Sequence, residues 1–151
     1  MNVYLLKANV NNYQTLAFGG EGVVRIYRRF NGAPLPEDLV LPPVEVLDAD
    51  RPASDFPGLT SHIPVFSRRA LNALGELLTP AGQWVPLHCE HAGEDYVAFN
   101  VTRVADALDP SLAKVKRYRS GRVMRVVAYA FLAERVGDAA IFKMPETVLS
   151  D

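Results

Sequence analysis

The stretch that decides the fold is Tyr96-Val-Ala-Phe-Asn-Val-Thr-Arg-Val-Ala-Asp-Ala-Leu-Asp109. Its first seven residues are rich in aromatic and β-branched side chains, which predicts an inner strand over 96–102. In that strand Val97, Phe99 and Val101 face one way, and Tyr96, Ala98 and Asn100 face the other. A polar Asn100 on a half-buried strand needs a partner, so we expect it to bond a neighbouring loop, with a pocket wall as the alternative. The rest of the stretch is an acidic turn.

The segment before this strand predicts its hairpin partner. Residues 84–90 alternate, with Val85, Leu87 and Cys89 on one face and Trp84 on the other. Pro86 has no N–H to donate to a ladder, so the strand lies at an edge of the sheet. Residues 91–95 form the turn between the two antiparallel strands.

One helix is clearly marked, over about 67–78. Ser67 is a good N-cap, and Phe66 and Leu71 have the spacing of a hydrophobic staple. The apolar positions recur at helical spacing: Ala70, Leu71, Leu74, Leu77 and Leu78. The sequence Thr-Pro-Ala-Gly at 79–82 ends the helix.

The segment 31–64 is irregular, because it contains seven of the chain's 11 prolines. We expect at most a short edge strand there, at Val44–Leu47. The segment also carries six acidic residues against Arg51 alone: Glu37, Asp38, Glu45, Asp48, Asp50 and Asp55. So long a segment is either a surface wrap over the sheet or a binding arm.

Five further elements complete the prediction. Val3–Leu6 and Val23–Tyr27 are expected to be strands, and Ile141–Met144 a last short strand. Arg122–Phe131 is apolar on both faces, so it should be a central strand covered by the Ser67 helix, followed by a helical turn at Leu132–Val136. The fold class is therefore α+β: a mixed or antiparallel sheet with one main helix packed across it, in a single domain spanning 1–151.

Composition limits the function classes. The chain has 151 residues, 49% hydrophobic and 22% charged, as in an ordinary globular protein. A net charge of −1 gives no overall preference for nucleic acid or anionic membrane. Cys89 is the only cysteine, so no intrachain disulfide forms. The sequence has no signal-peptide pattern and no apolar run of spanning length, and we expect a cytoplasmic protein without membrane contact.

Two groups of residues invite a catalytic interpretation. His88, Cys89 and His91 suggest a zinc site or a cysteine nucleophile, but a regular strand directs His88 and Cys89 to opposite faces. Asp106 and Asp109 form a pair of carboxylates, in a sequence where Asp commonly caps turn backbone. We expect no catalytic residue, metal or cofactor.

A basic stretch offers a different interpretation. Six cations lie within residues 114–125, where there is no acid: Lys114, Lys116, Arg117, Arg119, Arg122 and Arg125. With Tyr118 interleaved, this pattern is typical of polyanion binding, and Arg117, Tyr118, Arg119 and Arg122 are its candidate residues. Because the whole chain is nearly neutral, a solvated hairpin with its turn at Ser120-Gly121, or a protein contact, is favoured instead.

The order of elements resembles a known family. The motifs are Pro64-Val-Phe-Ser67 opening a leucine-rich helix, Phe99-Asn-Val101 with Val104–Asp109, and Asp138 with Ile141-Phe-Lys143 and Thr147–Asp151. They resemble the immunity-protein family of bacterial polymorphic toxin systems, first defined as a domain of unknown function. Family sequences usually continue past Leu-Ser-Asp with another helix and strand, whereas this sequence stops at Asp151, so a shortened version of the domain is an expectation.

The resemblance implies a small cytoplasmic α+β protein that binds and silences a toxin encoded beside it. It supplies no catalytic residues. For the contact we select Arg68, Arg69 and Trp84, and the acidic arm around Asp48, Asp50 and Asp55 as a steering surface for a basic toxin. Arg68 and Arg69 lie in the first helical turn, where the helix dipole disfavours exposed cations by roughly 0.3–1 kcal/mol. We therefore expect them to pair either with acidic residues of a partner or with acidic residues of the preceding loop. A homo-oligomer is compatible with this interpretation.

Overall fold

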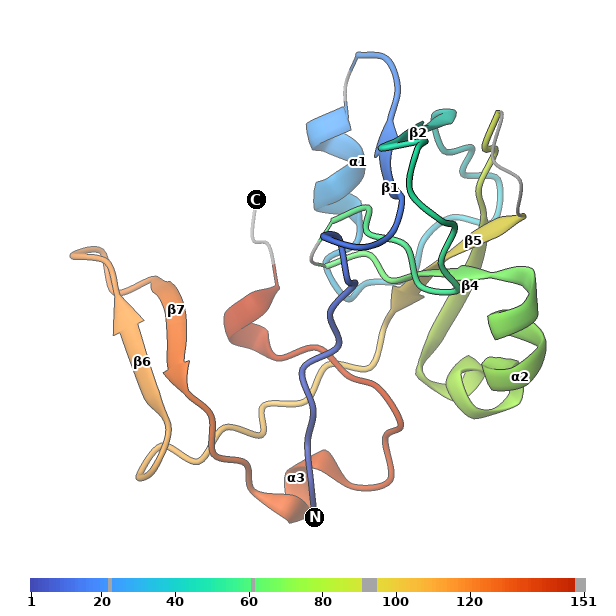
Figure 1. Ribbon diagram of the computed structural model, residues 1–151. Coiled ribbons are helices and arrows are strands. Elements are labelled where there is room, and N and C mark those ends of the chain that lie inside the picture. The colour runs from blue at the N-terminus through green and yellow to red at the C-terminus, as the bar shows by residue number, and fades with distance from the viewer. Residues whose placement is uncertain (22, 61, 91–94, 149–151) are drawn as a thin grey trace.

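The computed structural model describes residues 1–21, 23–60, 62–90 and 95–148. Its centre is a three-stranded antiparallel sheet in the order β3-β5-β4 (Figure 1). β5 (Tyr96–Val101) is the middle strand and is buried at every residue. It pairs with β3 (Val65–Ser67) on one side and with β4 (Gly82–Pro86) on the other. The predicted inner strand and the edge position of the Pro86 strand are both confirmed.

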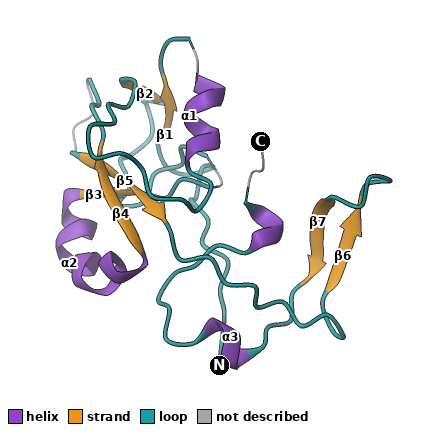
Figure 2. Ribbon diagram, turned by 180° about the vertical axis from the view of Figure 1, so that it is seen from behind, coloured by secondary structure: helices purple, strands orange, loops and turns teal. Residues whose placement is uncertain are grey.

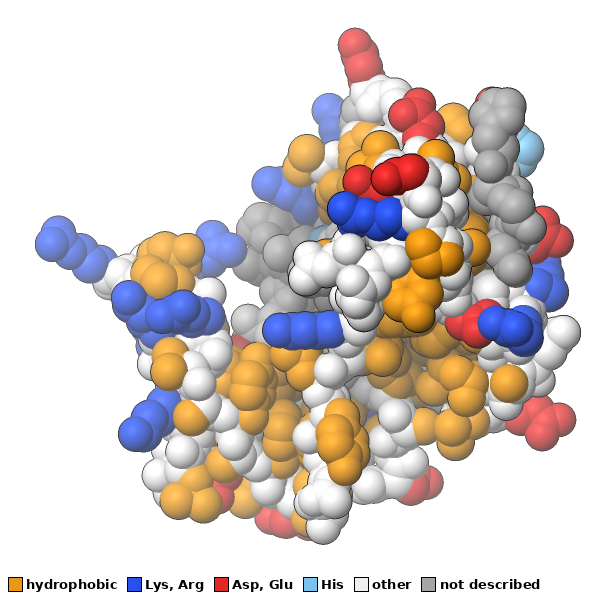
Figure 3. All heavy atoms as spheres, viewed as in Figure 1, with side chains coloured by type: hydrophobic (Ala, Val, Ile, Leu, Met, Phe, Trp, Pro, Cys, Tyr) orange, Lys and Arg blue, Asp and Glu red, His pale blue; other side chains and the backbone are white. Residues whose placement is uncertain are grey.

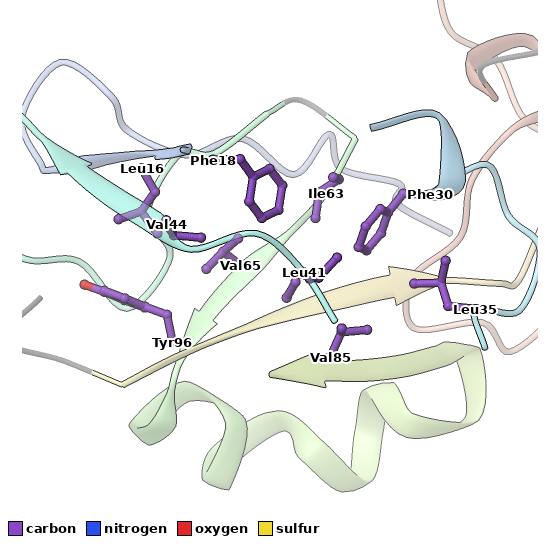
Figure 4. Packing of buried hydrophobic residues seen from close by; sticks show 11 residues of the cluster. Leu16, Phe18, Phe30, Leu35, Leu41, Val44, Ile63, Val65, Val85 and Tyr96 are labelled. Atoms are coloured by element: carbon purple, nitrogen blue, oxygen red, sulfur yellow. The ribbon is translucent and has the colours of Figure 1, made fainter. Parts of the chain in front are cut away.

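The two faces of β5 feed two separate cores, as its alternation predicts. Tyr96 and Ala98 join the larger core, which gathers side chains from β1, β2, β3, β4 and the Pro-rich segment (Figure 4). On the opposite face a second cluster, the aromatic core, contains Phe66, Leu78, Val97, Phe99 and Val101. Phe99 and Trp84 lie side by side in it, with ring centroids 4.5 Å apart. The sheet is therefore covered on both sides.

The main helix is α2 (Arg68–Leu78), and it packs on the aromatic core (Figure 1). Ser67 caps it, because its side-chain oxygen accepts a hydrogen bond from the Ala70 N–H at 3.1 Å. Phe66 and Leu71 meet in the aromatic core, as a staple requires. A 3-10 turn, η1 (Thr79–Ala81), with Pro80 at its start, ends the helix and leads into β4. The sequence prediction of the helix, its cap and its end is confirmed.

A second, two-stranded sheet covers the larger core. β1 (Thr15–Phe18) pairs antiparallel with β2 (Val44–Leu47), the short strand expected inside the Pro-rich segment. Helix α1 (Val23–Arg29) lies between them in the chain. The rest of 31–64 wraps the sheet: Leu35 and Leu41 are buried in the larger core. The segment is thus largely a structural wrap.

The C-terminal third is built differently. β6 (Lys114–Arg117) and β7 (Val123–Ala128) form an isolated antiparallel hairpin that projects from the rest of the molecule (Figures 1 and 2). Its turn contains Gly121, at φ +84°, and the Gly121 N–H bonds to the Tyr118 carbonyl, so the predicted Ser120-Gly121 turn is confirmed. Helix α3 (Ala133–Val136) and the 3-10 turn η2 (Pro145–Thr147) follow.

The described residues thus contain antiparallel sheets and three α-helices, an α+β fold with one main helix on the central sheet. No helix among them is long and apolar enough to cross a bilayer.

Several element predictions are wrong. Val23–Tyr27 is helical, because Val23, Ile26, Tyr27 and Phe30 form a stripe at i, i+3, i+4 and i+7 that packs on the larger core. Local β-propensity suggested a strand, and the helical period prevails. Val3–Leu6 forms no strand, and Tyr4 is 83% exposed. Around Ile141–Met144 only Lys143 makes a bridge, to Val104.

The largest correction concerns 122–131. β7 belongs to a two-stranded ribbon, not to the central sheet, and α2 does not cover it. Met124, Val127 and Tyr129 are exposed. The central sheet is built from β3 and β4 on the two sides of β5, and the partner of β7 is the charged strand β6. A strand apolar on both faces can therefore lie uncovered, because apolar pattern alone does not specify which element packs on it.

Candidate partner-binding surfaces

The N-terminal end of α2 is organised by Asp55, from the Pro-rich segment. Arg69 donates to it twice, through Nε to Oδ1 at 3.0 Å and Nη2 to Oδ2 at 2.5 Å. The Ser67 hydroxyl donates to the same Oδ1 at 2.5 Å. These bonds, those of Arg69 first, hold the pKa of Asp55 below its ordinary value. Arg69 and Asp55, which the sequence suggests for separate contacts with a toxin, thus bind each other. The acidic group that pairs with Arg69 comes from the preceding loop of the same chain.

Arg68 and Trp84 differ in how much of each side chain is accessible to a binding partner. Arg68 is exposed, and its backbone N–H donates to the Asp95 carbonyl at 2.9 Å. The Trp84 indole is half-buried in the aromatic core and donates to Thr79 Oγ1 at 3.0 Å. Trp84 therefore joins β4 to the end of α2, and only part of its ring reaches the surface.

Two leucines of the apolar stripe of α2 lie at the surface. Leu77 is 60% exposed and Leu74 37% exposed, whereas Leu78 is buried. The apolar stripe of the helix is wider than the sheet beneath it, so its flank remains uncovered. We call Leu74 and Leu77 the α2 surface; Arg68 and Arg69 lie in the first turn of the same helix, away from this flank.

The acidic arm is not one free surface. Asp48 has a positive φ of 53° and accepts from Thr15 Oγ1 at 3.0 Å and from Arg51 at 3.4 Å. Arg51 also donates to the Val10 carbonyl at 2.7 Å, which ties the N-terminal segment to this turn. Asp50 is exposed. Asp48 and Asp55 thus stabilise local structure, each with its own arginine.

The basic stretch forms the β6–β7 hairpin. Lys116 stands directly opposite Arg125 in the ladder, an arrangement of like charges that is unfavourable without an anion nearby. Arg117 donates to the Gly121 carbonyl at 3.0 Å, and Tyr118 is 55% exposed at the turn. A hollow of about 360 Å³ lies between β7 and η2, lined among others by Arg122, Arg125, Tyr129 and Glu146.

A second basic group lies on α1, and the sequence pattern alone does not reveal it. Arg25, Arg28 and Arg29 of α1 line a hollow of about 270 Å³ together with Asn31. All three arginines are exposed. They share one side of the molecule only because the segment is helical, since i, i+3 and i+4 are neighbours on a helix. The strand prediction for 23–27 concealed this grouping.

The residues selected for metal or cysteine chemistry are dispersed. The exposed His88 lies 3.6 Å from Glu90, while Cys89 packs against the larger core. Burial raises the pKa of the Cys89 thiol, with Asp95 adding to the rise, which disfavours the reactive thiolate. His91 lies outside the described residues. Within the described ranges, no three His, Cys, Asp or Glu side chains come together as a metal site would need.

The remaining polar candidates have structural partners. Asp106 pairs with Arg135 at 3.6 Å, and Asp109 Oδ1 accepts from the Ser111 N–H at 2.8 Å, as a turn cap does. Asn100 is fully buried and donates to the Ala33 carbonyl at 2.9 Å and to Gln83 Oε1 at 3.0 Å. The expectation that Asn100 bonds a neighbouring loop is confirmed.

Comparison of the chain with protein-family models, with curated proteins and with solved structures gave no match.

Proposed function

We propose that this chain is a non-catalytic immunity protein, which binds a cognate bacterial protein toxin and neutralises it by stoichiometric contact. The motifs at 64–67, 99–109 and 138–151 that resemble the immunity family support the proposal from the sequence. The observation that carries it is the α2 surface, where Leu74 and Leu77 are left exposed on the same helix as two arginines.

The chemistry of this surface suits a protein partner. Exposed leucines lose water-accessible apolar area when a partner covers them, at roughly 25 cal/mol per Å². Arg68 offers a guanidinium that can bind a carboxylate of the partner in a bidentate manner. The proposed anchors are Leu77 on the α2 surface and Arg68 at the start of the helix, so the partner spans the length of α2. In this proposal the Arg69–Asp55 pair holds the start of the helix in place, and Trp84 supports its end.

The test is co-purification with the products of the genes flanking its own, followed by calorimetry. We expect a 1:1 complex of nanomolar or tighter affinity, about −12 kcal/mol, and rescue of cells from the partner's toxicity. Leu77→Asp and Arg68→Glu should each weaken the complex. Leu112→Asp is the matched control, since Leu112 is an exposed leucine on a different part of the chain. Failure of every neighbouring product to bind the wild-type protein contradicts the proposal.

A further inference from the structure

The distribution of charge in the folded chain is strongly one-sided. Two of the chain's acid-free segments, 22–36 and 110–133, are rich in cations. They contain the three arginines of α1 and the six cations of the β6–β7 hairpin, nine of the chain's 16 lysines and arginines. All 17 acidic residues lie elsewhere. A nearly neutral chain thus contains two strongly basic elements.

These two elements lie on the same side of the molecule. Figures 1 and 2 show α1 and the hairpin on either side of the turn η2. In Figure 3, Lys and Arg side chains cover the hairpin and the neighbouring edge of the main body at α1. The ion pairs among the described residues involve other cations, namely Arg51, Arg69, His88 and Arg135. Among the described residues, Arg28, Arg29, Lys116 and Arg125 belong to none of these ion pairs.

Aromatic rings stand among the cations. Tyr118 is 55% exposed at the tip of the hairpin, and Tyr129 borders the hollow beside β7. The ring of Tyr129 is stacked on that of Phe131, with centroids 6.0 Å apart and planes at 17°. Cations for phosphates and flat rings for bases are the two elements of a surface that binds single strands.

We propose that α1 and the β6–β7 hairpin form a two-walled binding surface for single-stranded nucleic acid. Phosphates bind Arg28 and Arg29 on one wall, and Lys116 and Arg125 on the other, where an anion relieves the repulsion of the opposed pair. A base stacks on Tyr118. This activity goes beyond toxin neutralisation and does not depend on it, because the α2 surface belongs to a different element.

An acidic residue close to the hairpin opposes this use. Glu146 lines the hollow beside β7, and its Oε2 is buried without a hydrogen-bond partner among the described residues. A carboxylate at this place repels phosphate. Replacing it by the isosteric amide is therefore expected to strengthen binding, which gives the test a variant that gains function.

The experiment uses the full chain and a fluorescein-labelled oligouridylate, with anisotropy measured from about 50 to 200 mM salt. Three double variants each remove two charges: Arg28→Gln/Arg29→Gln, Lys116→Gln/Arg125→Gln, and the control Lys7→Gln/Arg68→Gln, which replaces two exposed cations outside both walls. Each wall double should reduce the slope of log K against log salt by roughly 1.4, at about 0.7 per phosphate of a single strand. The control should keep the wild-type slope.

Three further comparisons test the role of the ring, the role of the acid and the choice of ligand. Tyr118→Ala should weaken binding about tenfold, whereas Tyr4→Ala, another exposed tyrosine, should not. Glu146→Gln should bind more tightly than the wild type. An oligothymidylate bound equally well means that backbone and bases are read, and preference for oligouridylate means that the 2′-hydroxyl is read as well.

The proposal is overturned if the wild type does not bind at low salt, or if either wall double behaves like the control. It is also overturned if polyglutamate competes as well per charge as RNA and Tyr118→Ala has no effect. That result would assign the surface to an acidic polypeptide.

Discussion

Arg69 and Asp55 form a two-pronged ion pair, with Nε 3.0 Å from Oδ1 and Nη2 2.5 Å from Oδ2. The pair joins the Pro-rich segment to the first turn of α2. Ser67 belongs to the same group, since it donates to Asp55 and accepts from the Ala70 N–H. One carboxylate thus compensates the arginine that the helix dipole disfavours and orients the residue that caps the helix.

Replacement of Asp55 by Asn should give a pH-dependent loss of stability. In the folded chain the pKa of Asp55 lies below its ordinary value of 3.8, so the carboxylate stabilises the fold fully above that pH. This contribution is lost as the pH falls through the lowered pKa. Urea unfolding should show Asp55→Asn less stable than wild type at neutral pH, with the difference closing in acid. A difference that is constant with pH would contradict the assignment.

Removal of the cap should cost more than a surface substitution. Ser67→Ala leaves the Ala70 N–H without its partner, and we expect a loss of about 1–2 kcal/mol in the free energy of unfolding. Asn72→Ala is the control, because Asn72 is exposed in the same helix and Ala is the better helix former. Denaturant melts followed by circular dichroism measure both. Equal effects of the two variants would show that the Ser67 cap is not used.

Lys143 should make stability rise with pH. Its ammonium is half-buried and donates to the Phe30 carbonyl, and desolvation lowers its pKa from 10.5 to about 8. The unfolded chain therefore binds more protons than the folded chain between pH 8 and 10.5, and the free energy of unfolding increases across this window.

The variant Lys143→Met lacks this titration. Relative to it, the wild type should gain stability as the pH rises through the window. The exposed Lys7, replaced in the same way, is the control and should follow the wild type. The measurement is the urea unfolding midpoint of each variant at several pH values. Parallel curves of stability against pH for the wild type and Lys143→Met would contradict the expectation.

Two glycines should respond in opposite directions to alanine. A Cβ at Gly82 would lie 2.2 Å from the Asn100 carbonyl oxygen and 2.8 Å from the Phe99 ring, so Gly82→Ala should destabilise by about 1–3 kcal/mol or more. At Gly75, within α2, the nearest atom is at an ordinary 3.6 Å, and alanine should stabilise by about 1 kcal/mol. Thermal melts of the two variants should therefore shift to opposite sides of the wild type.

The helices and strands with a regular spacing of apolar residues and a clear capping or terminating residue were predictable. The α2 cap, the alternation of β5 and the edge position of β4 follow from Ser67, from the alternating apolar residues of 96–101 and from Pro86. α1 was mispredicted because four apolar residues satisfy a helical stripe and a local β preference at once. Packing on the larger core decides between them.

The candidate surfaces were less predictable than the elements. Arg69 and Asp55 are 14 residues apart, and no local rule brings a proline-rich loop to a helix start. The α1 arginines became neighbours only once the segment was helical.

The sequence by itself determined the α+β class, the central hairpin, the main helix with its cap, and the net charge. Those properties depend on residues close together along the chain, where period, capping and proline act directly. Tertiary structure alone decided that 122–131 stays uncovered, that Asp55 is paired, and that two acid-free segments lie on one side. These depend on contacts between distant residues, whose formation is governed by the packing of the whole chain.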